Sequence, residues 1–128
     1  MLKKTVITLL FIALIFPLQA ADRFFIGPGN WNATSSWSAT SGGATGASVP
    51  VASDIAYFDI NSNDCTITAT VSVAGIDTTG FTNTITQNAF AITVGASGIN
   101  WVSGTFSGST STITSNGGFI QSGGIFTA

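Results

Sequence analysis

The stretch DINSND is the part of this chain whose residue types and spacing best fit a metal site. Asp59, Asn61 and Asn63 follow the D-x-N-x-N spacing of a calcium-binding loop, and Asp64 adds a further carboxylate. Asp64 also replaces the glycine of the sharp turn, and Thr70 replaces the bidentate glutamate. We therefore interpret the stretch as a polar turn, with a Ca²⁺ site formed by Asp59, Asn61, Asn63 and Asp64 as the alternative.

Few side chains in this sequence can support acid–base or nucleophilic catalysis. It has no histidine and no glutamate, and its lysines are Lys3 and Lys4. From Cys65 to the last residue, the single charged side chain is Asp77. Serine and threonine are abundant, but a hydroxyl nucleophile needs a neighbouring base, and one cysteine without histidine cannot build a zinc site. We therefore predict that the chain is not an enzyme and has no catalytic residues.

The single cysteine, Cys65, begins the alternating run CTITATVSV. Alternate residues of a strand point to the same side, so the run places Cys65, Val71 and Val73 on an apolar face and Thr66 on a polar face. We interpret Cys65 as a small buried hydrophobic residue. A reactive or intermolecular thiol is the alternative.

The composition predicts the elements that hold these residues. Only 6% of the residues are charged and 45% are hydrophobic, whereas an ordinary soluble domain has about 25% charged residues. Beyond residue 20 the chain lacks the helix formers leucine, lysine and glutamate. It is rich in threonine, valine, isoleucine and phenylalanine, which favour strands, and in glycine, asparagine and serine, which favour turns. We therefore expect one all-β domain.

Residues 1–20 have the layout of a secretory signal peptide. Two lysines form a positive start, an apolar run from Val6 to Phe16 follows, and small residues surround the position after Ala20. The run is shorter than the about 20 residues that span a bilayer. We therefore expect cleavage after Ala20, or else after Ala21, and no transmembrane helix in the mature chain. The mature chain keeps one arginine against five aspartates, which argues against a nucleic-acid partner.

From Cys65 onward the sequence repeats with a period of about 21 residues. Three series of apolar residues show the period: Val71, Ile92 and Ile113; Ile85, Phe106 and Phe126; Ile76, Ile99 and Phe119. A repeat of this length without leucine fits one coil of a parallel β-solenoid, or β-helix. Coils in such a fold lie about 4.8 Å apart, so each series would form an inward-facing column. A β-sandwich is the main alternative, because it has a similar composition and short strands.

We divide the chain into a signal peptide (1–20), an N-terminal cap and loop region (21–64) and β-solenoid repeats (65–128). The last repeat ends in GGIFTA without a charged residue. An exposed strand edge pairs readily with other chains, and solenoids normally end in polar caps. We therefore expect that the repeats are truncated at the C-terminus. The alternative is self-association through the solenoid ends.

Trp31 and Trp37 are close in sequence and are separated by small polar residues. With Phe24 and Phe25 they would cover the open end of the first coil, which buries large rings and protects a strand edge. We expect this cap. The alternative is a ligand-binding platform in which Trp31 and Trp37 stack against a glycan.

The segment RFFIGPGNWNATSSWSATSGGATGASVPVASDIAYFD resembles the N-terminal module of large bacterial secreted or surface proteins, and it is also similar to segments of some phage structural proteins. The shared features are an Arg-aromatic-aromatic start, Gly-x-Gly-Asn-Trp, a second Trp, and a small-residue loop with Val-Pro before an Asp-rich strand. Here Gly27-Pro28-Gly29 replaces the usual glycine pair and Phe25 replaces the commoner Trp. The resemblance implies β-solenoid repeats of adhesin or haemagglutinin type, a family with no single activity.

Three TIT triplets, at 66–68, 84–86 and 112–114, are similar to the threonine ranks of ice-binding solenoids. A flat rank needs equal spacing, but the interval from the second triplet to the third is much longer than the interval from the first to the second. The triplets therefore do not share one coil position. We interpret them as ordinary outward-facing strand threonines.

Together these features predict a secreted or cell-surface, adhesin-like structural protein that mediates adhesion or assembly without catalysis. Its partner would be an unidentified surface ligand or glycan, or a second copy of the chain, and no cofactor is expected apart from the Ca²⁺ alternative. A carbohydrate-binding or carbohydrate-active β-helix module is the first alternative function, and ice binding is the second.

Overall fold

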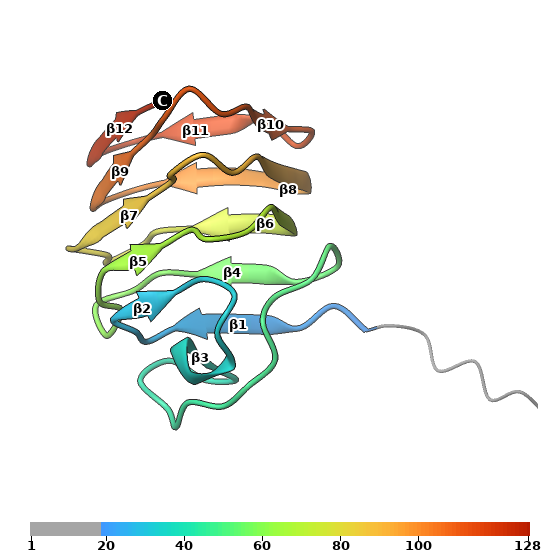
Figure 1. Ribbon diagram of the computed structural model, residues 1–128, viewed down its shortest axis with the longest axis vertical. Coiled ribbons are helices and arrows are strands. Elements are labelled where there is room, and N and C mark those ends of the chain that lie inside the picture. The colour runs from blue at the N-terminus through green and yellow to red at the C-terminus, as the bar shows by residue number, and fades with distance from the viewer. Residues whose placement is uncertain (1–18) are drawn as a thin grey trace, which may run out of the picture.

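Figure 1 shows the chain as a computed structural model, which describes residues 19–128. Residues 1–18 of the predicted signal peptide lie outside the described part of the chain. The described residues form short strands and one 3-10 turn, η1 (Thr34–Ser36). The strands are β1 (Asp22–Phe25), β2 (Gly29–Asn30), β3 (Trp37–Ser38), β4 (Ile55–Tyr57), β5 (Cys65–Thr66), β6 (Val71–Asp77), β7 (Thr84–Thr86), β8 (Ile92–Trp101), β9 (Thr105–Ser107), β10 (Ile113–Ser115), β11 (Phe119–Gln121) and β12 (Ile125–Thr127).

Strands from successive coils stack into two sheets. One sheet has the order β10-β8-β6-β4-β1-β3, with β11 also beside β8, and the other has the order β12-β9-β7-β5-β2. The pairs between coils are parallel, whereas β1 and β3 pair antiparallel. Each coil passes from one sheet to the other, and the next coil lies directly over it (Figure 1). The predicted all-β parallel solenoid is confirmed, and a β-sandwich is excluded.

The strand register confirms the predicted columns. It places the partners opposite one another in the columns Val71–Ile92–Ile113, Ile85–Phe106–Phe126 and Ile76–Ile99–Phe119. The register shifts within β8, because Val94 pairs with Val73 whereas Gly98 pairs with Gly75. This bulge lengthens one coil. The residues of β6 and β8 that pair after the bulge are therefore further apart in sequence than those that pair before it.

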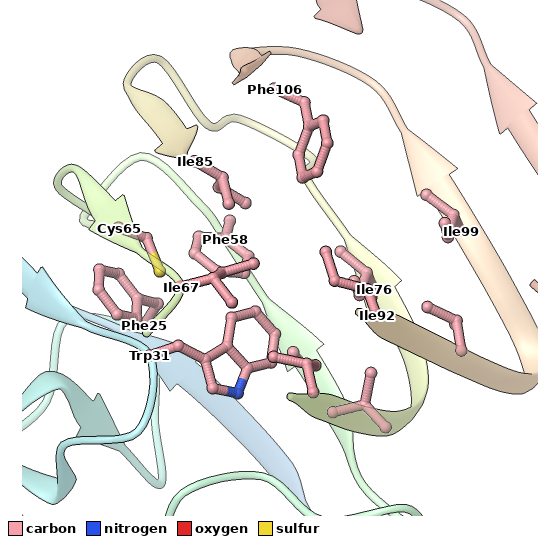
Figure 2. Packing of buried hydrophobic residues seen from close by; sticks show 14 of the residues in the cluster. Phe25, Trp31, Phe58, Cys65, Ile67, Ile76, Ile85, Ile92, Ile99 and Phe106 are labelled. Carbon is pink, nitrogen blue, oxygen red and sulfur yellow. The ribbon is translucent and has the colours of Figure 1, made fainter. Parts of the chain in front are cut away.

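Apolar side chains from both sheets fill the space between them. Figure 2 shows Ile76, Ile92 and Ile99 of one sheet facing Ile85 and Phe106 of the other. The cavity left at the centre of this core has a volume of about 10 Å³, which is room for about one water molecule. A ligand of the described coils therefore has to bind at their outer faces or ends.

Aromatic residues close the N-terminal end of the solenoid, as predicted. Phe25, Trp31 and Trp37 are buried, and the Trp37 ring meets the other two edge-on, with ring centroids 5.1 and 5.0 Å apart. The indole N–H of Trp37 donates a hydrogen bond to the main-chain oxygen of Trp31. Because β3 pairs with Phe24 and Phe25 at the outer edge of β1, this cap covers that part of the edge against a foreign strand.

The stacked coils begin before the sequence repeats become visible. β1 pairs with β4, and β4 pairs with β6, both in parallel, so the region 21–64 contributes two coils in addition to the cap. A loop of residues 39–54 separates β3 from β4 and interrupts the period. Phe24 was expected in the cap, but it alternates with the buried Phe25 and stacks on Tyr57, one coil above, with ring centroids 5.0 Å apart.

Candidate functional site

Trp31 and Trp37 do not form a surface platform for a ligand. Their exposed fractions are 3% and 0%, and their ring planes lie at 72° to each other. A sugar ring stacks on an accessible aromatic face, and neither indole offers one. The two residues therefore serve as the cap of the first coil.

The four residues of the predicted calcium site lie in the turn between β4 and β5. Asp59 and Asn61 both hydrogen-bond to the Ser41 hydroxyl, whereas Asn63 and Asp64 have other partners. Asp59 Oδ1 accepts a hydrogen bond from Asn61 N at 2.8 Å, and Asp64 Oδ1 accepts one from Thr84 N at 2.9 Å. The Asn63 amide donates to a main-chain oxygen between β1 and β2. Within residues 19–128, no three His, Cys, Asp or Glu side chains are grouped as metal ligands. The geometry is that of a polar turn tied to the neighbouring coils.

The outer face of the first sheet carries a column that the sequence analysis missed. It consists of one residue from each coil in register: Phe24, Tyr57, Asp77, Asn100 and Ile120. Asn100 Nδ2 donates a hydrogen bond to Asp77 Oδ2 at 2.8 Å. The rings of Phe24 and Tyr57 lie nearly parallel, at 16°, so each covers one face of the other. Asp77 and Asn100 directly follow Ile76 and Ile99, which the sequence already places in one column, so the pair could have been found by reading one residue further along that column.

Two side chains of this column have shifted pKa values. Burial, followed by the negative charges of Asp22 and Asp77, raises the pKa of Tyr57. Partial burial acts to raise the pKa of Asp77, but hydrogen bonds from Asn100 and Thr79 outweigh it and lower that pKa. At neutral pH the column therefore holds a neutral phenol and a carboxylate, which can accept hydrogen bonds from a ligand but form no acid–base pair near neutrality.

The outer face of the second sheet presents hydroxyl groups. Thr66, Thr86, Ser107 and Thr127 lie in register on successive coils. The TIT triplets do not share a coil position, as the spacing predicted, because the first residue of one triplet aligns with the last residue of the next. The hydroxyl column follows from the alternation of side chains along each strand.

Cys65 lies inside the core, as its place in the alternating run predicted. Its side chain is 1% exposed and forms no disulfide. Burial raises the pKa of the thiol far above its usual value. Because the thiolate is the reactive form, the thiol of the folded protein is inert at neutral pH.

The end opposite the cap is a coil with an open edge, at the top of Figure 1. β10, β11 and β12 each pair on one side only. The Gly118 carbonyl faces β8, where it accepts a hydrogen bond from Ile99 N at 3.0 Å. Main-chain groups alternate sides along a strand, so those of Phe119 and Gln121 point away from the neighbouring coil and have no strand partner.

Exposed apolar side chains gather on the same coil. Phe119, Ile120 and Ile125 are 44%, 67% and 61% exposed, and a hollow of about 260 Å³ opens beside Phe119 and Phe126. No charged residue follows Asp77 in the sequence. An apolar, uncharged strand edge is a template for pairing with another strand. We call β10, β11 and β12 together the open edge.

A scan of protein-family models finds no match to this chain, and searches of curated proteins and of solved structures find none either. Among residues 19–128 there is also no helix of the length and apolarity that a membrane crossing requires. The function must therefore be inferred from the faces and ends of the solenoid.

Proposed function

We propose that this chain is a secreted or cell-surface structural protein of adhesin type, which mediates adhesion or assembly and catalyses no reaction, and that residues 21–128 assemble through their open edge. The observation that carries the proposal is the difference between the two ends of the solenoid. The first coil is covered by β3 and buried tryptophans, whereas the last coil exposes unpaired strands and apolar side chains.

This difference favours a closed pair of molecules over a filament. A filament needs the open edge of one molecule to bind the opposite end of the next, but β3 and the buried aromatic residues of the cap cover part of that end. Two open edges can instead meet around a two-fold axis, because each offers the same unpaired donors, acceptors and apolar side chains. No charged side chain follows Asp77, so like-charged side chains do not oppose the contact.

The outer faces of the rod supply the surface for adhesion. The second sheet presents a column of hydroxyl groups and the first sheet presents Asp77 beside Asn100, groups that hydrogen-bond to polar ligands such as glycans. The signal-peptide layout of residues 1–20 supports export. The resemblance of residues 23–59 to the leader module of bacterial surface proteins supports the adhesin class.

The test is the mass of residues 21–128 in solution, measured by light scattering over a range of concentrations. We expect reversible dimers for the natural sequence and monomers for Phe119→Lys, because that variant places a charge within the open edge. Ile60→Lys is the matched control. It also replaces an apolar residue by lysine, but at a position between β4 and β5 that is 68% exposed and lies outside the open edge, and it should dimerise like the natural sequence.

Two results would contradict the proposal. One is a natural protein that stays monomeric at all concentrations. The other is equal loss of dimers in Phe119→Lys and Ile60→Lys, which would show that the added charge, and not its place in the open edge, prevents association.

A further inference from the structure

Asp54 is a buried carboxyl group at the start of β4. Its side chain is 3% exposed and accepts hydrogen bonds from three donors. Oδ1 accepts from Ala21 N at 3.0 Å and from the Ser53 hydroxyl at 3.3 Å, and Oδ2 accepts from Val51 N at 3.0 Å. Three donors and no acceptor surround the group, which is the environment of a carboxylate. Burying a carboxylate is unfavourable unless a positive charge pairs with it.

No cation of the described residues pairs with Asp54. Arg23 is the one arginine or lysine within residues 19–128, and its guanidinium donates elsewhere. Its Nη2 donates to the Ser48 hydroxyl at 2.8 Å, and its Nη1 donates to the main-chain oxygen of Asp22 at 3.0 Å. Asp54 therefore holds three hydrogen-bond donors without a compensating charge.

The nitrogen of Ala21 is the atom that signal-peptide cleavage would charge. Cleavage after Ala20 converts this nitrogen from an amide into an α-ammonium group, at a position 3.0 Å from Asp54 Oδ1. The Ala21 carbonyl also accepts a hydrogen bond from Ile55 N at 3.1 Å, so the residue is held on both sides. Ala20 is exposed, which leaves the bond after it accessible to a peptidase.

We propose that removal of residues 1–20 creates an ion pair between the new α-ammonium group of Ala21 and the buried carboxylate of Asp54. The pair locks the start of β1 against β4, the first two coils of the solenoid. Its hydrogen bond becomes charge-assisted and therefore stronger. Processing then stabilises the fold, and the mature chain is more stable than its precursor. This proposal rests on the predicted signal peptide and is independent of assembly at the open edge.

The test compares three forms of residues 21–128 at neutral pH and at a concentration where the protein is monomeric. One form begins with the free amine of Ala21, one is acetylated on that amine, and one carries Gln19 and Ala20 as an extension. We expect the free-amine form to melt at least about 4 °C above the other two. Asp54→Asn should remove this difference, because it removes the charge that the amine binds.

A second measurement needs no substitution. The amine of Ala21 should react with an acylating reagent at least about tenfold more slowly than the amine of the extended form, because it is held by Asp54. Equal melting temperatures of the three forms, or equal reaction rates, would overturn the ion pair. The mass of the exported protein identifies its first residue. If that residue is not Ala21, processing does not create the ion pair and the proposal is wrong.

Discussion

Asp77 and Asn100 lie one coil apart on the outer face of the first sheet, and their hydrogen bond of 2.8 Å links β6 to β8. The carboxylate also accepts a hydrogen bond from Thr79 N at 2.8 Å. Hydrogen bonds to charged groups contribute about 1.5–3 kcal/mol when buried, but this carboxylate is partly exposed, so solvent screening reduces the contribution to about 1 kcal/mol. Within the repeats from Cys65 onward, this pair is the one place where a charged side chain forms a hydrogen bond between two coils.

We predict that Asn100→Ala raises the pKa of Asp77 towards its usual value and lowers the free energy of unfolding by about 1 kcal/mol at neutral pH. A lowered carboxyl pKa contributes stability above the pKa of the unfolded state, and the contribution is lost as the pH falls through the folded-state pKa. The natural protein and the variant should therefore converge in acid. Urea unfolding at both pH values, with a carboxyl NMR titration, measures the effect.

Asn116→Ala is the control for Asn100→Ala, because Asn116 is an exposed asparagine in the turn that follows β10. It should leave the pKa of Asp77 unchanged. An Asn100→Ala protein that is destabilised equally at neutral and acid pH would show that Asn100 acts through packing and not through the carboxylate.

At the scale of elements, each coil depends on the tight turns that carry the chain from one sheet to the other. Gly104 lies between β8 and β9 with φ at +80°, a conformation that L side chains rarely adopt. A Cβ at this position would lie 2.3 Å from Phe81 Cδ1, and Phe81 is fully buried in the coil below. The turn thus needs glycine for two separate reasons, backbone conformation and close packing.

We predict that Gly104→Ala is markedly destabilising. Backbone strain at positive φ would lower the free energy of unfolding by about 1–2 kcal/mol, and displacement of Phe81 would lower it by about 1–3 kcal/mol more. Gly118→Ala separates the two effects, because Gly118 has φ at +93° but open space around its position. In urea unfolding, Gly118→Ala should lower the free energy of unfolding only by the amount that comes from backbone strain. If the two variants lose equal free energies, a clash between the Cβ added at position 104 and Phe81 does not contribute.

At the scale of the whole molecule, charge is unevenly distributed along the rod. The single arginine and the five aspartates of residues 19–128 all lie between Asp22 and Asp77, in the coils nearer the cap. The coils that carry the open edge have no ionisable side chain that is charged at neutral pH. Contact between two open edges would therefore depend on apolar burial and main-chain hydrogen bonds.

We predict that the dissociation constant of the proposed dimer changes by less than about twofold between about 0.05 M and about 0.5 M NaCl, because salt screens only interactions between charges. Sedimentation at the two salt concentrations measures it. A dimer that dissociates in salt would instead depend on attraction between Arg23 and the aspartates near the cap, and it would contradict assembly through the open edge.

The period and the alternation of the sequence predict the inward-facing half of the repeats. Val71, Ile92 and Ile113 follow one another at equal intervals of one coil length, so the period alone predicts that these residues stack. The alternation around Cys65 predicts its burial in the same way, because neighbouring strand residues face opposite sides. The cap followed from aromatic residues placed before the repeats, since large rings near an open coil are most stable when they cover it.

The contacts made by the irregular parts of the chain depend on the folded path of the whole chain. Asp54 contacts Ala21 across a sequence separation that the regular period does not contain. This contact depends on the path of the loop 39–54. A period specifies the contacts between equal coils, but a loop or bulge changes the register, and its new partners are set by how the whole chain packs.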